Sequence, residues 1–279
     1  MKIARNISEL ALARKSVAAD LALVPTMGAL HAGHLSLVEL AQSKAAATAV
    51  SIFVNPSQFN NADDLKKYPR TIENDLELLK VAGVDIVFIP DVAELYPDGF
   101  QTSIALSELS QPLEGKFRPG HFKGVATVVT ILLNLVQPSK VVFGEKDFQQ
   151  LCVVKQLIKD LKIPVEVIPA PTFREESGLA MSSRNELLSK ADREIASNIS
   201  KVLISARSQV EAGETDCEKI INKCHELFNQ EKAIDVEYLI IASSINLIQQ
   251  KEITKNSRVF FAGAIAGVRL IDNIKLALA

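Results

Sequence analysis

Short, uninterrupted apolar runs recur along the first 173 residues, separated by stretches whose apolar residues return every three or four positions. Such runs are typical of parallel strands buried on both faces, and the wider spacing is typical of helices. The predicted strands are 21–24, 49–54, 85–89, 140–143 and 164–168, and the predicted helices are 34–46, 71–82, 122–136 and 148–161. Residues 101–109 are a candidate for one more strand outside this alternation. The pattern predicts an α/β fold with a Rossmann-like, doubly wound parallel sheet.

The pattern changes after residue 173. Two amphipathic helices are predicted over 189–212 and 216–230, then a strand over 235–242 and a hairpin over 257–273 that turns near Gly263–Gly267. Grouped helices followed by grouped strands indicate an α+β unit. We therefore predict two domains, a Rossmann-like domain over 1–173 and a smaller α+β C-terminal lid domain over 174–279.

Composition narrows the function classes. The 279 residues are 48% hydrophobic and 23% charged, which indicates a folded globular chain. The net charge of −2 lacks the basic footprint of a nucleic-acid-binding protein. The three cysteines fit neither a disulfide framework nor a metal site, which favours a reducing compartment. The longest apolar stretch, 124–136, is shorter than the roughly 20 residues that cross a bilayer, and charged residues interrupt the amino terminus early. We expect a cytoplasmic protein.

The segment TMGALHAGHL (26–35) joins a predicted strand to a predicted helix and holds two of the chain's four histidines. Gly28 and Gly33 permit tight turns and close approach of a ligand. The N–H groups and positive end of the following helix favour a phosphate. His31 and His34 lie one helical turn apart, so both can face one ligand and stabilise charge on a phosphoryl group. A glycine turn with two capping or surface histidines is the alternative, and the strand–helix junction favours function.

Polar residues also end the second predicted strand, in FVNPSQF (53–59). Pro56 forces Asn55 into an extended conformation, so Asn55 and Gln58 would project at the carboxyl edge of the sheet. Side-chain amides there can bind hydroxyl and carboxylate oxygens. An ordinary strand-end turn is the alternative, and from these residues alone it is the favoured one.

The segment VVFGEKDFQQL (141–151) repeats the strand–turn–helix arrangement. Gly144 makes the turn, and Lys146 stands where its charge can neutralise phosphates. Asp147 is a plausible helix N-cap, and Gln150 lies one turn beyond it, within reach of the same crevice.

Near the domain boundary, LAMSSRN (179–185) carries two hydroxyls and an arginine that can donate to phosphates from a mobile segment. A serine N-cap is the alternative for Ser182 or Ser183. A glycine-punctuated segment at 113–129, ahead of a helix, is also basic, and it is either part of a site wall or a solvated charge cluster. Its basic residues are Lys116, Arg118, His121 and Lys123.

The His-x-Gly-His of residues 31–34 resembles the signature shared by nucleotidyltransferases and class I aminoacyl-tRNA synthetases. The fuller string VPTMGALHAGHLSLV and the four later segments, in order from residue 25 to residue 185, resemble one family within that superfamily, the pantoate–β-alanine ligases. Ala180 and Ser183 stand where the synthetases' KMSKS loop has lysines, which argues against a tRNA synthetase.

The resemblance implies ligation of (R)-pantoate and β-alanine to pantothenate through a pantoyl adenylate, with release of AMP and pyrophosphate. It implies catalytic roles for His34, His31, Lys146 and Arg184. It implies ATP binding by Met27, Gly28, His31, His34, Gly144, Lys146, Asp147, Phe173, Met181, Ser182, Ser183 and Arg184, and binding of pantoate or β-alanine by Gln58, Gln150 and Asn55. It also implies Mg²⁺ with ATP, no metal-binding residues of the protein, and a homodimer. The polar segment 59–69 is predicted to be a mobile wall over the adenylate.

Two other functions stay open from the sequence. A nucleotidyltransferase of the same superfamily would leave the nucleotide on its product and need no β-alanine, and the glutamines and the second domain argue against it. A non-enzymatic nucleotide-binding protein would need neither both histidines nor Lys146.

Overall fold

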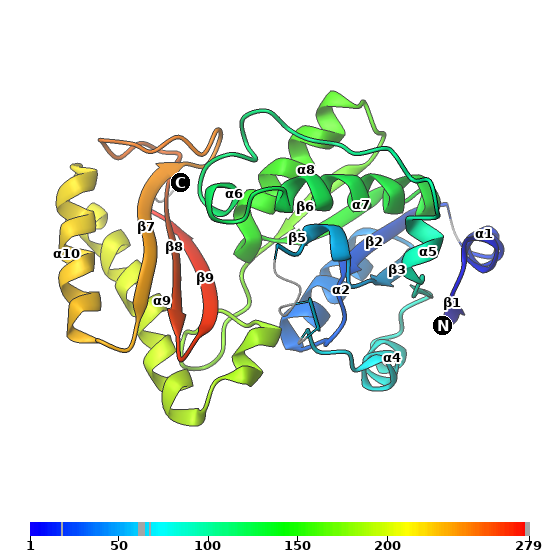
Figure 1. The fold of residues 1–279 in the computed structure, drawn as a ribbon, viewed down its shortest axis with the longest axis horizontal. Coiled ribbons are helices and arrows are strands. Elements are labelled where there is room, and N and C mark those ends of the chain that lie inside the picture. The colour runs from blue at the N-terminus through cyan, green and yellow to red at the C-terminus, as the bar shows by residue number, and fades with distance from the viewer. Residues whose placement is uncertain (18, 61–64, 67, 277–279) are drawn as a thin grey trace. The chain divides into compact units, whose positions relative to one another are not determined.

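The computed structural model describes residues 1–17, 19–60, 65–66 and 68–276. Its contacts divide the chain into two compact units (Figure 1). The first unit contains residues 1–145 and 149–171, and the second contains residues 146–148 and 172–279. The short segment Lys146–Phe148 therefore belongs with the C-terminal part of the chain, whereas the sequence pattern grouped it with the first domain. The predicted mobile wall at 59–69 lies partly outside the described residues.

A six-stranded parallel sheet forms the centre of the first unit (Figure 1). Its strands are β1 (Lys2–Ala4), β2 (Leu21–Thr26), β3 (Ala47–Ile52), β4 (Ile86–Phe88), β5 (Lys140–Gly144) and β6 (Glu166–Ala170). Their order is β1-β4-β3-β2-β5-β6, and every described pairing is parallel. The predicted α/β fold with a doubly wound sheet is confirmed.

Helices cover the sheet of the first unit. They are α1 (Ile7–Lys15), α2 (Ala32–Lys44), α4 (Ile72–Val81), α5 (Val92–Leu95), α6 (Glu114–Phe117), α7 (His121–Val136) and α8 (Phe148–Asp160). Helix α2 contacts β2, β3 and β5, and α1 contacts β1, β4 and α7. Consecutive residues Leu21–Val24 of β2 are all fully buried, because helices cover both faces of the sheet.

The strand order places a topological switch between β2 and β5. From β2 the chain proceeds to β3 and β4 on one side, and it later continues on the other side with β5 and β6. In open parallel sheets, ligands bind beyond the carboxyl ends of the strands at such a switch. The two loops that follow Thr26 of β2 and Gly144 of β5 are therefore the first place to look for a site.

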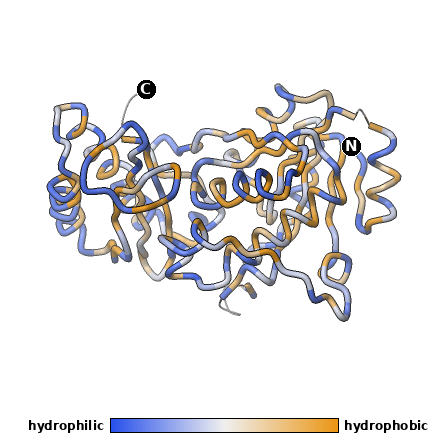
Figure 2. Tube along the Cα trace, turned by 90° about the horizontal axis from the view of Figure 1, so that it is seen from above, coloured by the Kyte–Doolittle hydropathy of each residue, from blue (hydrophilic) through white to orange (hydrophobic). Residues whose placement is uncertain are grey.

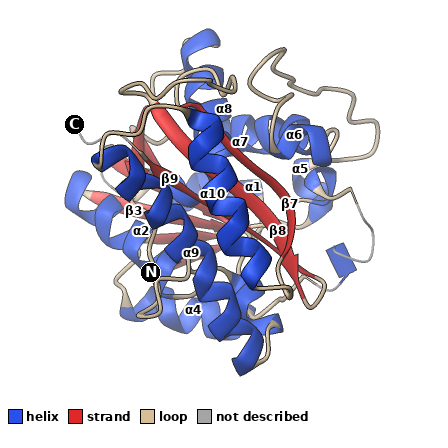
Figure 3. Cartoon of the chain, turned by 90° about the vertical axis from the view of Figure 1, so that its left-hand side faces the viewer, coloured by secondary structure: helices blue, strands red, loops and turns tan. Residues whose placement is uncertain are grey.

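The second unit contains a three-stranded antiparallel sheet in the order β7-β8-β9. Its strands are β7 (Asp235–Ser243), β8 (Ser257–Ile265) and β9 (Val268–Lys275), and its helices are α9 (Lys190–Glu211) and α10 (Cys217–Gln230). Both helices lie across one face of this sheet (Figure 3). They enclose a separate core that includes Leu203, Ile220 and Phe261.

One predicted element is wrong. Residues 101–109 form no strand, and the backbone N–H of Ile104 donates instead to the Thr127 hydroxyl of α7 at 3.0 Å. The short apolar run Ile104–Leu106 belongs to a loop that this hydrogen bond ties to α7. The short elements β1 and α1 lacked a long apolar run and were not predicted.

Hydrophobic and hydrophilic residues alternate along the helical coils (Figure 2), as expected of helices with one buried and one exposed face. Within the described part of the chain, no helix combines the length and the apolar character that crossing a membrane requires.

Candidate active site

The loop after β2 begins with a sharp turn. The Thr26 hydroxyl donates to the Ser51 carbonyl oxygen at 2.8 Å and accepts from the Gly28 N–H at 3.2 Å. Gly28 and the following Ala29 both have positive φ angles, +82° and +50°. This turn carries the chain from the carboxyl end of a central strand into α2.

His31 and His34 lie together at the start of α2. The His34 N–H donates to the His31 carbonyl oxygen at 2.8 Å, and the His31 N–H points at His34 Nδ1 across 3.4 Å. Their ring centroids are 4.1 Å apart. When Nδ1 of His34 accepts this bond, the proton of a neutral ring is on Nε2, so Nε2 is a donor. The structure thus pairs the two imidazoles at the switch point, as the spacing predicted.

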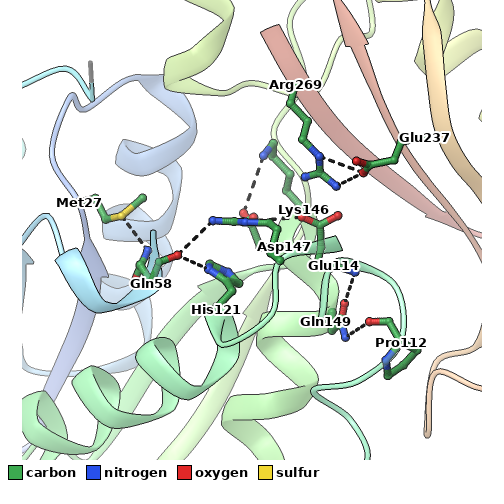
Figure 4. A network of polar contacts seen from close by, with 11 residues as sticks. Met27, Gln58, Pro112, Glu114, His121, Lys146, Asp147, Gln149, Glu237 and Arg269 are labelled. Atoms are coloured by element: carbon green, nitrogen blue, oxygen red, sulfur yellow. Dashed lines mark hydrogen bonds and ion pairs between the residues drawn. The ribbon is translucent and has the colours of Figure 1, made fainter. Parts of the chain in front are cut away.

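Gln58 lies in the 3₁₀ turn Pro56–Gln58 that follows β3, and its side chain is 8% exposed. Its Nε2 approaches Met27 Sδ at 2.9 Å, so Gln58 and Met27 adjoin each other (Figure 4). Two predicted site residues from different loops of the first unit are therefore neighbours.

Asn55 does not project from the sheet edge as expected, because its side chain is 1% exposed. Its Oδ1 accepts from the Ser57 N–H, the Ser57 hydroxyl and the Tyr96 hydroxyl at 3.3, 2.8 and 2.9 Å. Its Nδ2 donates to Gln58 Oε1 at 3.2 Å and to the Gly124 carbonyl oxygen at 3.1 Å. In this structure Asn55 organises the turn that presents Gln58.

The basic residues of the 113–129 segment differ in what they contact. Buried His121 contacts the Gln58 carbonyl oxygen through Nδ1 at 2.8 Å (Figure 4), and half-buried Arg118 donates to the same oxygen at 3.4 Å. Lys116 and Lys123 are exposed. The first two residues support the Gln58 turn, and Lys123 lines a cavity beside it, whereas Lys116 fits the solvated-cluster interpretation.

A cavity of about 370 Å³ adjoins this turn within the first unit. Ser57, Tyr96, Phe100, His121 and Thr127 are among its lining residues. Burial raises the pKa of Tyr96 above its usual value, against its hydrogen bonds with Ser57 and Asn55, which lower it, so the phenol stays protonated at neutral pH.

At the carboxyl end of β5, Gly144 is followed by the 3₁₀ turn Glu145–Asp147 and by α8. Gln150 is half-buried on the first turn of α8. Its neighbour Gln149 is buried, accepts from the Glu114 N–H at 3.0 Å and donates to the Leu109 and Pro112 carbonyl oxygens (Figure 4). Gln149 fixes the loop before α6, a role that the sequence analysis missed.

Lys146 belongs to the second unit, where its backbone carbonyl oxygen accepts from Asn273 Nδ2 at 2.8 Å. Its ammonium is 3.9 Å from Asp147 Oδ2, and the Asp147 carboxylate is about half exposed. Lys146 lines a narrow pocket of the second unit together with Ser182, Arg184 and Arg269. Two of the cations predicted to bind phosphate thus lie on one pocket.

Local hydrogen bonds fix the conformation of the 182–184 segment. The Ser182 hydroxyl accepts from the Arg184 N–H at 3.3 Å as an N-cap, and Ser183 is 9% exposed. The Met181 N–H donates to the Phe173 carbonyl oxygen at 3.0 Å, which brings those two predicted residues together. The N-cap interpretation of Ser182 is correct, and it leaves the Arg184 side chain on the pocket.

Some residues around these sites carry no motif of their own. Asp75 accepts from backbone N–H groups of the histidine loop. Tyr96 is hydrogen-bonded to Asn55, and Asn273 is hydrogen-bonded to Lys146. Each contact joins positions at least 41 residues apart. Only the apolar surroundings of Asp75 in a predicted helix signalled that its carboxylate is buried.

The comparisons identify relatives over the full chain. Residues 2–275 match the family model described as pantoate-beta-alanine ligase. A pantothenate synthetase from Aquifex aeolicus is 45% identical over 258 residues, 92% of this chain and 91% of the relative. The crystal structure of a pantothenate synthetase from Thermus thermophilus superposes with a TM-score of 0.95 at 40% identity, with both chains covered completely. A ligase from Francisella tularensis, solved in complex with beta-gamma ATP and beta-alanine, has a TM-score of 0.82 at 38% identity and covers 100% of this chain and 99% of its own.

Proposed function

The chain belongs to the pantoate–β-alanine ligase family, and on this basis we propose that it ligates (R)-pantoate and β-alanine to pantothenate at the expense of ATP. The Francisella tularensis relative was solved with beta-gamma ATP and beta-alanine, which supports ATP and β-alanine as substrates in this proposal. The observation that carries the proposal is the His31–His34 pair, with ring centroids 4.1 Å apart at the topological switch of the sheet.

The reaction has two steps. A carboxylate oxygen of pantoate attacks the α-phosphorus of ATP, and the bond to pyrophosphate breaks. The β-alanine amine then attacks the acyl carbon of the pantoyl adenylate, AMP leaves with the bonding electron pair, and the amine loses a proton. The protein's contribution is positioning and charge stabilisation, with no covalent enzyme intermediate.

In the first unit, His31 and His34 stabilise charge on the α-phosphoryl group, and Nε2 of His34 donates a proton or hydrogen bond. Gln58 and Gln150 orient pantoate through their amides. Asn55 acts in this proposal through Gln58, whose Oε1 accepts from Asn55 Nδ2 at 3.2 Å. Met27, Gly28 and Gly144 let ATP approach the backbone at the ends of β2 and β5.

In the second unit, Lys146 and Arg184 supply positive charge to the ATP phosphates, and Ser182 and Ser183 supply hydroxyl or backbone donors. Phe173, Met181 and Asp147 complete the proposed ATP contacts. Lys146, Ser182 and Arg184 all line the narrow pocket of that unit, so these three proposed phosphate contacts lie near one another.

Mg²⁺ accompanies ATP in this proposal. Among the residues that the structure describes, no three His, Cys, Asp or Glu side chains are grouped as metal ligands. The proposal gives the ion phosphate oxygens and water as its main ligands, which Mg²⁺ prefers in nucleotide sites.

The test measures AMP release from ATP with pantoate and β-alanine together and with each omitted in turn. The proposal expects AMP only when both are present. Pyrophosphate release with another acceptor would instead indicate a nucleotidyltransferase. Absence of turnover in every mixture, with intact ATP binding, would indicate a non-enzymatic nucleotide-binding protein.

We also propose that the protein is a cytoplasmic homodimer. Its cysteines, Cys152, Cys217 and Cys224, are buried thiols, which suits a reducing compartment. Light scattering on the purified protein tests the dimer, for which the expected mass is twice the 30.4 kDa of one chain.

A further inference from the structure

We propose that Asp75 is a positioning residue for the histidine pair: its buried carboxylate fixes the backbone turn from which His31 and His34 are presented. The inference rests on the proposed function of those histidines. Its first experiment reads the positions of the rings without any turnover, so that failure of the ligase assignment and failure of this inference can be told apart.

The carboxylate of Asp75 binds two successive backbone N–H groups of the histidine loop. Oδ2 accepts from Ala29 at 3.0 Å and Oδ1 accepts from Leu30 at 2.8 Å. Asp75 lies 45 residues beyond Leu30 in the chain, on α4, and is 0% exposed. Bulk water does not reach these N–H groups in the intact protein, so loss of the carboxylate would leave two buried donors without their partner.

The carboxylate is itself fixed in place. The Thr71 hydroxyl donates to Asp75 Oδ1 at 3.0 Å, and the Asp75 N–H donates to the Thr71 carbonyl oxygen at 2.8 Å. Thr71 is the N-cap of α4, so the same turn of helix fixes both the backbone and the side chain of Asp75. Hydrogen bonds from two amides and a hydroxyl compensate for burial of the charge.

The turn needs such support because of its backbone conformation. Ala29 has a φ of +50°, in the left-handed region that costs a residue with a Cβ roughly 1–2 kcal/mol. A Cβ added to Gly28 would lie 3.0 Å from Asp75 Oδ2 and 3.0 Å from Ile52 Cγ2. The two left-handed residues direct consecutive N–H groups at one anion, and Asp75 is that anion.

The histidines follow directly. His31 is two residues beyond Ala29 and is the N-cap of α2, and His34 lies in the first turn of that helix. If Ala29 relaxed to an ordinary φ, His31 would change direction while the body of α2 stayed packed on the sheet. A displacement of about 1 Å at a catalytic group can lower the rate about a hundredfold.

The first experiment uses Asp75→Asn, which keeps the size and one acceptor oxygen but turns an N–H₂ group toward a backbone N–H. Only four histidines are present, so their ring C–H signals can be assigned by NMR. We expect the His31 and His34 signals to shift while that of His225 does not. In the unaltered protein the Ala29 and Leu30 amides should exchange as slowly as those of β2, and in Asp75→Asn they should exchange faster.

The second experiment is kinetic. We expect Asp75→Asn to lower kcat about 10- to 100-fold and to change KM for ATP by less than about threefold, because misplaced histidines lose transition-state stabilisation. Asp85→Asn is the matched control, since Asp85 Oδ2 also accepts a backbone N–H, that of Thr48 at 2.8 Å, near the amino end of β3. It should lower stability but not kcat.

Rescue separates positioning from general stability. Glycine adopts a positive φ without strain, so Ala29→Gly in the Asp75→Asn background should recover part of kcat. If Asp75→Asn does not fold, Thr71→Val is used in the kinetic test instead, and it should lower kcat by a smaller factor. Unshifted His31 and His34 signals together with unchanged kcat would overturn the inference, as would rapid exchange of the Ala29 and Leu30 amides in the unaltered protein.

Discussion

The side-chain amide of Asn273 donates a hydrogen bond to the backbone carbonyl oxygen of Lys146 across 2.8 Å. Asn273 is 4% exposed on β9 and also accepts from Arg258 Nη1 through Oδ1. The guanidinium of Arg258 lies 3.9 Å from the ring centroid of Phe148, two residues after Lys146. These contacts anchor the lysine segment to the sheet of the second unit.

Asn273→Asp should therefore weaken ATP binding. The variant keeps the acceptor for Arg258 but places a carboxylate oxygen against the Lys146 carbonyl oxygen. One hydrogen bond is worth about 0.5–1.5 kcal/mol, which predicts a rise in KM for ATP of up to about tenfold. Asn246→Asp is the control, because Asn246 is exposed and uses only Oδ1 in the turn after β7. An unchanged KM in a folded Asn273→Asp protein would contradict the anchoring role.

His34→Ala should fold normally and lose adenylation. Loss of a proton donor and of charge stabilisation predicts a fall of about a hundredfold or more in kcat for AMP formation. Thermal unfolding of the variant checks its fold. His225→Ala, on α10 of the second unit, is the matched control and should retain activity. Near-normal turnover in folded His34→Ala would refute the role of His34.

Gly124→Ala should disrupt the Gln58 turn. A Cβ at this position would lie 2.4 Å from the Ser57 carbonyl oxygen and 2.8 Å from the Gln58 nitrogen, which are backbone atoms that cannot rotate away. Overpacking of this kind costs about 1–3 kcal/mol. We expect a lower unfolding midpoint and a higher KM for pantoate. Asn134→Ala, an exposed change on the same helix, should alter neither.

Cys217 and Cys224 should resist thiol reagents in the folded protein. Burial is the main cause that raises the pKa of each thiol from 9.0 to about 11. Two pKa units mean about a hundredfold less thiolate at pH 8. In a Cys152→Ala protein, Ellman's reagent should react slowly until urea unfolds the chain. Rapid reaction of the folded protein would contradict the raised pKa values.

The same thiols predict alkaline destabilisation. Because their folded pKa lies above the unfolded value of 9.0, their contribution to stability is complete below pH 9 and is lost as pH rises toward 11. A Cys224→Ala protein should be less stable at pH 8 but lose less of its unfolding free energy between pH 9 and 11 than the parent. Urea denaturation at both pH values measures this difference.

The sequence pattern was sufficient to predict the strands and helices whose apolar residues recur regularly. Five of the six parallel strands, β2 to β6, and the helices α2, α4, α7 and α8 were predicted, because buried parallel strands and amphipathic helices leave distinct apolar patterns. The prediction of a strand over 101–109 was wrong because the short apolar run Ile104–Leu106 belongs to a loop that is hydrogen-bonded to α7. Its partner, the Thr127 hydroxyl, is 23 residues from Ile104 and leaves no local pattern.

For the site, motifs identified the residues that carry chemistry but not those that hold them. The pairing of His31 with His34 followed from their spacing, since one helical turn brings two rings together. Asp75 and Gln149 were missed because their partners lie 35 or more residues away. Asn55 was placed facing substrate because a strand end is usually exposed, whereas Tyr96, from another loop, buries it.

The assignment of Lys146–Phe148 to the second unit has a consequence for dissecting the chain. The polypeptide passes between the units at 145/146, at 148/149 and at 171/172, so no single cleavage separates them with their residues intact. A fragment starting at residue 172 would lack the lysine and the Phe148 ring on which Arg258 rests. Modular recombination of this C-terminal unit with a foreign nucleotide-binding domain therefore requires grafting a tripeptide into the recipient as well as fusing the tail.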